Sequence, residues 1–134
     1  MPQTKVASHG LIKKDNRFLV TRRSAVNDYM PEFWDIPGGT IEFGEKAIDA
    51  LNREIKEETT LVVDVGKFIF CYDFLSGPER HQFQIVYECN YKNGEVKLDP
   101  QEHDDFKWVT LEEMESLPKI AFLDKLFKFL KNNS

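Results

Sequence analysis

The segment from Glu45 to Thr59 constrains the fold more than any other part of the chain. It contains no proline or glycine and consists mainly of residues with high helix propensity. Ile48, Leu51 and Ile55 recur at i, i+3 and i+7, the spacing that places apolar side chains on one face of an α-helix. The pattern predicts an amphipathic helix that packs this apolar stripe on the rest of the protein.

Three carboxylates lie close together on the same predicted helix. At about 100° per residue, Glu54, Glu57 and Glu58 span an arc of roughly 100° and are neighbours at i, i+3 and i+4. Carboxylates this close repel one another unless a cation lies among them. A hard divalent cation prefers oxygen ligands, and Mg²⁺ bound together with substrate phosphates fits best.

An ordinary solvated face is the alternative interpretation of these glutamates. The helix already has a polar face elsewhere, made by Asp49, Asn52 and Lys56. On the helical wheel Glu58 lies almost in line with Leu51, so the acidic stripe borders the core, where unpaired charge is unfavourable. The position of the stripe therefore favours a metal site.

The rest of the chain is rich in strand-like runs and closes with a second helical pattern. Asp15-Asn16 separates the runs 6–13 and 17–21, which predicts a hairpin. Further strands are expected at 33–37, 61–75, 83–91 and 106–109, with a bulge or break at Gly66, and helices at 111–117 and 120–130. Strands around two main helices predict an α/β protein with a mixed β-sheet and helices packed on it.

Length, charge and cysteine usage limit the function classes. The 134 residues suit one compact domain, residues 1–134. The net charge of −5 argues against binding to a nucleic acid polymer, which needs a basic surface. No apolar run approaches membrane-spanning length. Cys71 and Cys89 form no CxxC pattern and are interpreted as free thiols in a reducing compartment, so a cytoplasmic location is expected.

A longer pattern surrounds the acidic helix. It reads Gly39, five residues, Glu45, seven residues, and then Arg53-Glu54-Ile55-Lys56-Glu57-Glu58-Thr59-Thr60-Leu61. This resembles the Nudix box of the MutT-like Nudix hydrolases, and it matches at every charged and apolar position. The preceding segment from Trp34 to Gly39 also resembles the family's approach to the box. The resemblance implies a Nudix-like α/β/α sandwich, a mixed β-sheet with helices packed on both sides.

The family resemblance also implies roles for individual residues. Glu54, Glu57 and Glu58 would bind Mg²⁺, or Mn²⁺ in its place, and provide the base, with no single glutamate assigned to the base. The backbone carbonyl of Gly38 would join the metal shell. Arg53 would position the carboxylates and Glu45 would pair with it, a contact that requires Glu45 to lie at the frayed start of the helix. Glu102, an acid outside the box, would complete the site or activate water; a solvated loop acid is the alternative.

Substrate contacts are assigned only by residue chemistry. Arg22 and Arg23, at the end of a predicted strand, suit phosphate because the guanidinium is a fork of donors. Tyr29, Phe33 and Phe74 are candidates for stacking on a base, although a place in the core is the ordinary role of such aromatics. His81 and His103 lack metal-like spacing and are expected to be surface or pocket residues.

One position departs from the family pattern. Thr60 replaces a glycine that ends the helix in a left-handed conformation. A β-branched residue in that conformation is disfavoured by roughly 1–2 kcal/mol. Either the helix ends differently here, or some strain is tolerated. Because no ligand, acid or base is lost, the chemistry is expected to be unaffected.

The resemblance implies a hydrolase that cleaves the pyrophosphate bond of a nucleoside diphosphate-linked small molecule. The compact length favours a nucleoside triphosphate, including oxidised ones such as 8-oxo-dGTP. ADP-ribose or a nucleotide sugar is the alternative substrate. A catalytically silent, nucleotide-sensing module is a further alternative, although such modules usually lose the box carboxylates that this chain keeps. Homodimerisation is left open.

Overall fold

The computed structural model describes residues 1–27 and 30–133. Its elements follow in chain order: β1 Gln3–Lys14, β2 Arg17–Arg23, β3 Trp34–Asp35, β4 Gly38–Thr40, α1 Ala47–Thr59, β5 Val62–Gly77, β6 Arg80–Asn93, β7 His103–Val109, α2 Leu111–Met114 and α3 Ala121–Asn132. The predicted strands and helices are all present in the described residues, most of them longer than predicted. Tyr29 lies outside the described residues.

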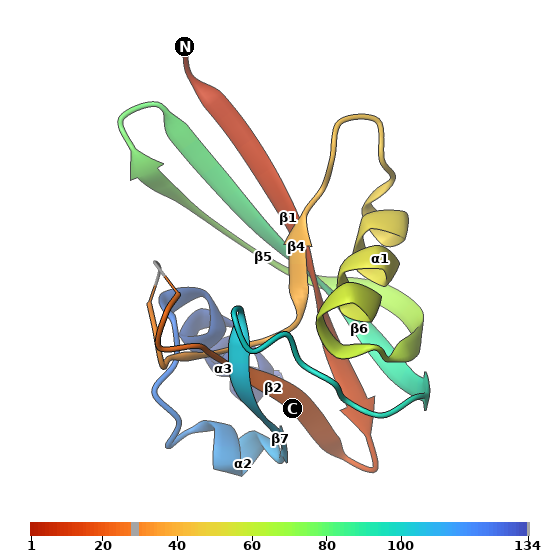
Figure 1. The fold of residues 1–134 in the computed structure, drawn as a ribbon. Coiled ribbons are helices and arrows are strands. Elements are labelled where there is room, and N and C mark those ends of the chain that lie inside the picture. The colour runs from red at the N-terminus through yellow and green to blue at the C-terminus, as the bar shows by residue number, and fades with distance from the viewer. Residues whose placement is uncertain (28–29, 134) are drawn as a thin grey trace.

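A mixed sheet organises the fold (Figure 1). Its strand order is β3-β2-β1-β6-β5, with β4 also paired to β1 and β7 to β2. β1 and β6 are parallel, whereas the other pairs are antiparallel. The register of β5 on β6 shifts between Val65 and Phe68, around Gly66, where the sequence predicted a bulge.

Two cores lie on opposite faces of the sheet. Leu11 and Val20 belong to the core that includes α3, while their neighbours Ile12 and Leu19 belong to the core that includes α1. Successive strand residues point to opposite faces, so each central strand supplies both cores. Helices therefore pack on both sides of the sheet, and the predicted fold class is confirmed.

The start of α1 differs from the prediction. The helix begins at Ala47, so Glu45 and Lys46 precede it. The predicted apolar stripe is also wrong at one position, because the Ile48 side chain is 44% exposed. Ile48 lies in the first turn, ahead of the turns that bury Leu51 and Ile55.

The end of α1 is left-handed at the residue where the family has glycine. Thr60 has φ 64° and ψ 7°, and its N–H donates to Lys56 O. The Thr60 hydroxyl donates to Glu95 O at 2.5 Å. The helix therefore ends as a glycine would end it, with a β-branched residue held in the left-handed region by the cap and this bond.

A projecting part of the sheet borders the site. We call it the arm, defined as residues 3–9 of β1, 72–77 of β5 and 80–84 of β6. Figure 1 shows the arm extending beyond the rest of the sheet. No helix in the described residues is long and apolar enough to span a membrane. Cys71 and Cys89 are free thiols, as expected.

Candidate active site

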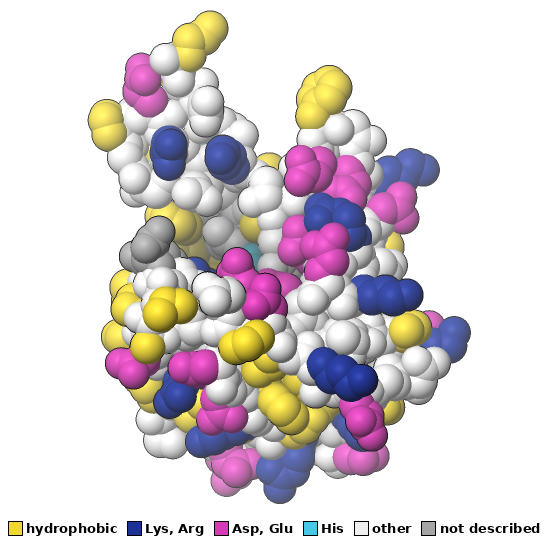
Figure 2. All heavy atoms as spheres, viewed as in Figure 1, with side chains coloured by type: hydrophobic (Ala, Val, Ile, Leu, Met, Phe, Trp, Pro, Cys, Tyr) yellow, Lys and Arg dark blue, Asp and Glu magenta, His cyan; other side chains and the backbone are white. Residues whose placement is uncertain are grey.

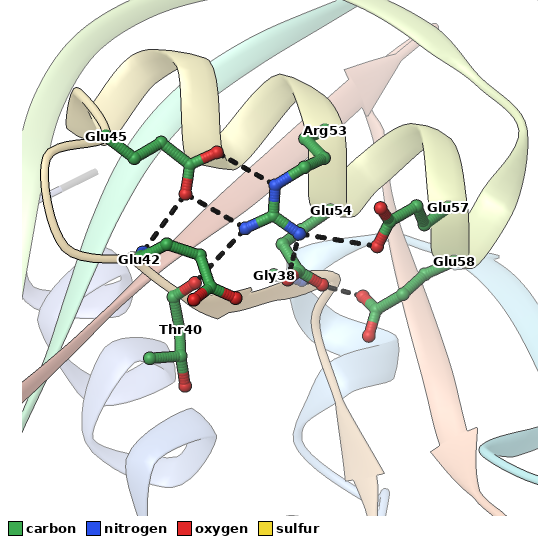
Figure 3. Close-up of polar contacts among 8 residues, drawn as sticks. All are labelled: Gly38, Thr40, Glu42, Glu45, Arg53, Glu54, Glu57 and Glu58. Atoms are coloured by element: carbon green, nitrogen blue, oxygen red, sulfur yellow. Dashed lines mark hydrogen bonds and ion pairs between the residues drawn. The ribbon is translucent and has the colours of Figure 1, made fainter.

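Arg53 is the centre of an ion-pair network on α1 (Figure 3). Its Nε and Nη2 donate to the two carboxylate oxygens of Glu45, at 2.8 and 3.0 Å. Its Nη1 donates to Glu54 at 2.8 Å and to Glu57 at 3.4 Å. The hydrogen bond from Arg53 holds the pKa of Glu45 at about 2. The start of α1 at Ala47, later than predicted, makes this contact possible, because Glu45 lies outside the helix.

Glu58 lies in a different environment from the other two glutamates. It is partly buried, and its Oε1 accepts the Gly38 N–H at 2.9 Å. Burial raises the pKa of Glu58 to about 8, against the opposing effect of this hydrogen bond. Burial also raises the pKa of Glu54, although its bond to Arg53 lowers it. Desolvation of a carboxylate favours the neutral form unless a cation compensates for it.

The two glycines of β4 allow neighbouring elements to lie close to the strand, α1 at Gly39 and β1 at Gly38. A Cβ atom at Gly39 would overlap the carboxyl group of Glu54. A Cβ atom at Gly38 would overlap Ser8 O and the ring of His9. Glycine at position 39 therefore brings the Glu54 carboxylate against the backbone of β4, and glycine at position 38 allows β4 to lie close to β1.

A cavity of about 260 Å³ brings the acids together. It is lined by Glu54, Glu57, Glu58, Asp99, Glu102 and His103. Glu102, which the sequence singled out, is therefore placed with the helix glutamates. Asp99 was missed. The signal available for it was its position in the same acidic loop, where Glu102 N–H donates to Asp99 O at 2.9 Å.

The donors in this cavity are chemically suited to a hard divalent cation. Carboxylate oxygens dominate its lining, and in the part of the chain that the structure describes no lysine or arginine forms an ion pair with the desolvated Glu58. Within residues 1–27 and 30–133, no group of three or more aspartate, glutamate, histidine or cysteine side chains has the geometry to hold a metal ion. Arg53 accounts for this in part, because it holds Glu54 and Glu57.

A larger cavity of about 520 Å³ adjoins the acidic one, and Glu58 and His103 line both. Its other walls include His9, Arg23, Phe74, Gln82, Gln84 and Phe122. Figure 2 shows acidic side chains gathered beside a hollow between the arm and the rest of the molecule. The arrangement provides an acidic compartment next to one with aromatic and amide walls.

The structure places only some of the substrate-binding residues proposed from the sequence in the larger cavity. Arg23 and Phe74 line the larger cavity. Arg22 is not among the lining residues; its Nε donates to Asp104 at 2.8 Å. Phe33 is likewise absent from the cavity and packs against the core that includes α3. Strand alternation separates Arg22 from Arg23, since neighbouring residues of β2 face opposite ways.

The histidines also differ in their surroundings. His103 is buried between the two cavities, and burial lowers its pKa. His81 is on the surface and pairs with Asp73 at 2.7 Å. His9 was not predicted as a site residue, yet it is buried and lines the larger cavity. No spacing rule in the sequence pointed to His9.

Comparison with known proteins agrees with this geometry. A family model described as the NUDIX domain matches residues 1–130. The chain belongs to the NUDIX hydrolase family. A crystal structure of a MutT protein from Methanosarcina mazei Go1 has 27% sequence identity and a TM-score of 0.86, and covers 99% of this chain and 97% of that one.

Two curated relatives of this NUDIX chain have different names. A protein of Methanocaldococcus jannaschii named ADP-ribose pyrophosphatase is 36% identical over 121 residues. That alignment covers 87% of this chain and 66% of the relative, so the chain spans slightly less than two thirds of that protein. Nucleoside triphosphatase NudI of Escherichia coli O139:H28 is 28% identical over 114 residues, 78% of this chain and 80% of that one. The MutT-like Nudix resemblance of residues 39–61 is confirmed.

Proposed function

We propose that the protein is a magnesium-dependent pyrophosphohydrolase that acts on a nucleoside triphosphate. The observation that carries the proposal is the junction of the two cavities at Glu58 and His103. A triphosphate needs a cation-binding compartment for its phosphates beside a compartment for its nucleoside. Oxidised nucleotides such as 8-oxo-dGTP belong to the same substrate class.

The carboxylates of Glu54, Glu57 and Glu58 and the Gly38 carbonyl would hold Mg²⁺ or Mn²⁺. When bound, the cation supplies neutralisation of the phosphate charge and polarisation of the attacking water. One carboxylate among the three helix glutamates and Glu102 accepts a proton as water attacks phosphorus. Water attack breaks the phosphoanhydride bond, and a monophosphate leaves with pyrophosphate or a second phosphorylated fragment.

Arg53 and Glu45 act as positioning residues in this proposal. Arg53 contacts Glu54 and Glu57, and Glu45 holds Arg53 through two hydrogen bonds. Partners that orient metal ligands affect metal affinity and activity although they touch neither metal nor substrate. In the larger cavity, Arg23 offers donors to phosphate and Phe74 an aromatic surface to the nucleoside.

ADP-ribose is the second candidate substrate. The Methanocaldococcus jannaschii relative, 36% identical, carries the name ADP-ribose pyrophosphatase and therefore favours it. The NudI relative is named a nucleoside triphosphatase and favours the first candidate. Free thiols at Cys71 and Cys89 support the cytoplasm, a reducing compartment, as the location.

The test is a substrate panel with the products resolved by chromatography. The panel contains the common nucleoside triphosphates, 8-oxo-dGTP, ADP-ribose and a nucleotide sugar, each with Mg²⁺ and with chelator. Cleavage of triphosphates at a higher kcat/KM than ADP-ribose supports the proposal. Preference for ADP-ribose overturns the substrate assignment, and binding without any cleavage would indicate a nucleotide-sensing module.

A further inference from the structure

On the face of β6 that α3 covers, a buried apolar residue is followed by polar residues beyond the start of α3. Val86 on β6 is buried in the core that includes α3, and Gln84, Gln82 and Arg80 follow it along the same face at two-residue intervals. α3 begins at Ala121, and the ring of Phe122 lines the larger cavity. All three polar residues line this cavity too. Two half-buried amides therefore line the cavity on the same face of β6 as the buried Val86.

His9 contacts the amide of Gln84 from the neighbouring strand β1. The His9 Nε2 atom lies in hydrogen-bond contact with Oε1 of Gln84. On the other side of the ring, Nδ1 lies 3.3 Å from Ile36 O. The ring of Phe122 packs against His9 with a centroid separation of 4.7 Å. The imidazole is thus held in one orientation by contacts on both its edges and its face.

Hydrogen-bond accounting decides which end of the Gln84 amide faces the cavity. Ile36 O can only accept, so the neutral His9 ring must carry its proton on Nδ1 to make that bond. Nε2 is then an acceptor and requires an N–H from Gln84. The two ends of a side-chain amide have the same shape, and the surrounding bonds determine which end lies where. Exchanging the oxygen and nitrogen of the Gln84 amide puts its NH₂ group, in place of Oε1, against Nε2. In this orientation Gln84 turns its carbonyl oxygen away from His9.

We propose that Gln84 is a specificity-determining residue that presents this carbonyl oxygen to the nucleobase, and that His9 is its positioning residue. The inference rests on the proposed function of nucleotide hydrolysis. The substrate class is a nucleotide whose base carries an exocyclic amino group, because that group donates the hydrogen bond that Gln84 accepts. A site built to accept such a bond discriminates against analogues that lack the donor.

The surroundings of Gln84 suit a base edge. Gln82 donates from Nε2 to Ser76 Oγ at 3.0 Å, which leaves the Gln82 carbonyl as a second acceptor on the same face. Phe74, the cross-strand partner of Gln82, supplies an aromatic wall beside it. An aromatic wall for the base face and amide acceptors for its edge are the two elements of base recognition.

The first test is the ¹⁵N NMR spectrum of histidine-labelled protein without metal or substrate. The chain contains three histidines, and the His9 signals are assigned by their loss in His9→Phe. The neutral His9 ring should carry its proton on Nδ1, with Nε2 unprotonated. A proton on Nε2 would overturn the proposed orientation of Gln84, whatever the protein hydrolyses.

The second test measures the preference for the amino group. Each triphosphate is paired with an analogue in which hydrogen replaces the amino group of adenine, guanine or cytosine. For the pair that is cleaved best, the kcat/KM of the triphosphate should exceed that of the analogue without the amino group by about tenfold or more in the wild type. One neutral hydrogen bond supports a ratio of this order. A ratio near one would overturn the proposal.

Variants then assign the preference to the two residues. Gln84→Met keeps the side-chain length without an acceptor, so the ratio should fall to about one, mainly through KM. Gln84→Glu keeps an acceptor and should keep the preference. In His9→Phe the Gln84 amide turns freely, and the ratio should fall several-fold. The double variant His9→Phe with Gln84→Glu should recover it, because both ends of a carboxylate accept, whereas a merely structural role of His9 predicts no recovery.

The matched control is His81→Phe. His81 lies on the face of β6 opposite to Gln84, and the substitution removes its pairing with Asp73 of β5. Its amino-group ratio should equal that of the wild type. If the wild type cleaves no nucleotide, the proposed function fails while the NMR test still decides the geometry. If it cleaves nucleotides and Gln84→Met keeps the wild-type ratio, only the role of Gln84 fails.

Discussion

Arg53 binds both carboxylate oxygens of Glu45, with Nε to Oε2 at 2.8 Å and Nη2 to Oε1 at 3.0 Å. Both donors on this edge of the guanidinium are therefore engaged by one carboxylate that lies before α1. The remaining nitrogen, Nη1, reaches Glu54 and Glu57. The bidentate pair thus fixes the guanidinium plane and, through it, the side chains of two proposed metal ligands.

Replacement of Arg53 by Lys should lower activity by roughly 10–100-fold, since lysine keeps the charge but lacks the planar fork that contacts three carboxylates. The melting temperature should change little, because the side chain is partly exposed at 32%. The readout is kcat/KM together with the Mg²⁺ concentration for half-maximal rate. Arg17→Lys, which alters an exposed pair with Glu113, is the control and should leave both unchanged. Wild-type kinetics in Arg53→Lys would contradict the positioning role.

Replacement of Glu57 or Glu58 by Gln should lower kcat by a factor on the order of 10² or more, because each change removes a charge from the proposed metal site. In chelator the Glu58 variant should be more stable than the wild type, since it no longer has a desolvated carboxylate. The Glu57 side chain is 59% exposed, so loss of its pair with Arg53 should cost at most about 0.5 kcal/mol.

Rates at saturating Mg²⁺ and urea melts in chelator, measured on the same samples, check both expectations. Glu112→Gln, an exposed glutamate on α2, is the control and should leave kcat at the wild-type value. Near wild-type rates in both site variants would show that this helix is not the catalytic element.

The metal-free protein should lose stability as the pH rises from 4.5 to about 8. The pKa of Glu58 is raised from 4.5 to about 8 in the folded state, so in this range the folded protein binds more protons than the unfolded chain. Its contribution is therefore fully present below pH 4.5 and is lost as the pH rises through about 8. Urea melts in chelator across this range, for the wild type and Glu58→Gln, isolate the effect. Parallel pH profiles for the two proteins would contradict it.

Thr60→Gly should stabilise the fold by up to about 1 kcal/mol, because Thr60 is held at φ 64° and glycine adopts this conformation without a Cβ penalty. Loss of the hydroxyl bond to Glu95 O offsets part of the gain. Thr60→Ala separates the two effects, since it loses the same bond and keeps the Cβ atom. Denaturant melts should rank the Gly variant above the Ala variant, and activity should be retained in both. An equal or lower stability of the Gly variant would contradict the strain.

Chelation should abolish turnover, and Mg²⁺ or Mn²⁺ should restore it, because the acidic cavity provides oxygen donors for a hard cation. The same ions should raise the melting temperature of the wild type, since a ligand that binds only the folded state stabilises it. Glu58→Gln should reduce this thermal shift, which provides a readout independent of catalysis. Full turnover in chelated buffer would rule out the metal mechanism.

Local sequence patterns were enough to predict the strands and helices and the acidic stripe of α1. The turn at Asp15-Asn16, the bulge at Gly66 and the spacing of the helix glutamates all depend on residues near one another in sequence. Two local inferences needed correction or completion. Ile48 is exposed although it continues the apolar spacing, and Glu45 lies outside the helix that its propensity would extend. Both residues lie at the N-terminal end of α1, ahead of the turns that bury Leu51 and Ile55.

The sequence by itself determined that α1 carries three carboxylates on one stripe, because helical periodicity is a property of neighbouring residues. Only the tertiary structure decided what meets that stripe and what lines the cavity beside it. His9 and Gln84 are 75 positions apart and meet because β1 and β6 pair in parallel. Asp99 reaches the glutamates of α1 from the loop between β6 and β7. Such contacts depend on strand register and loop packing, which are set by the whole core rather than by any local pattern.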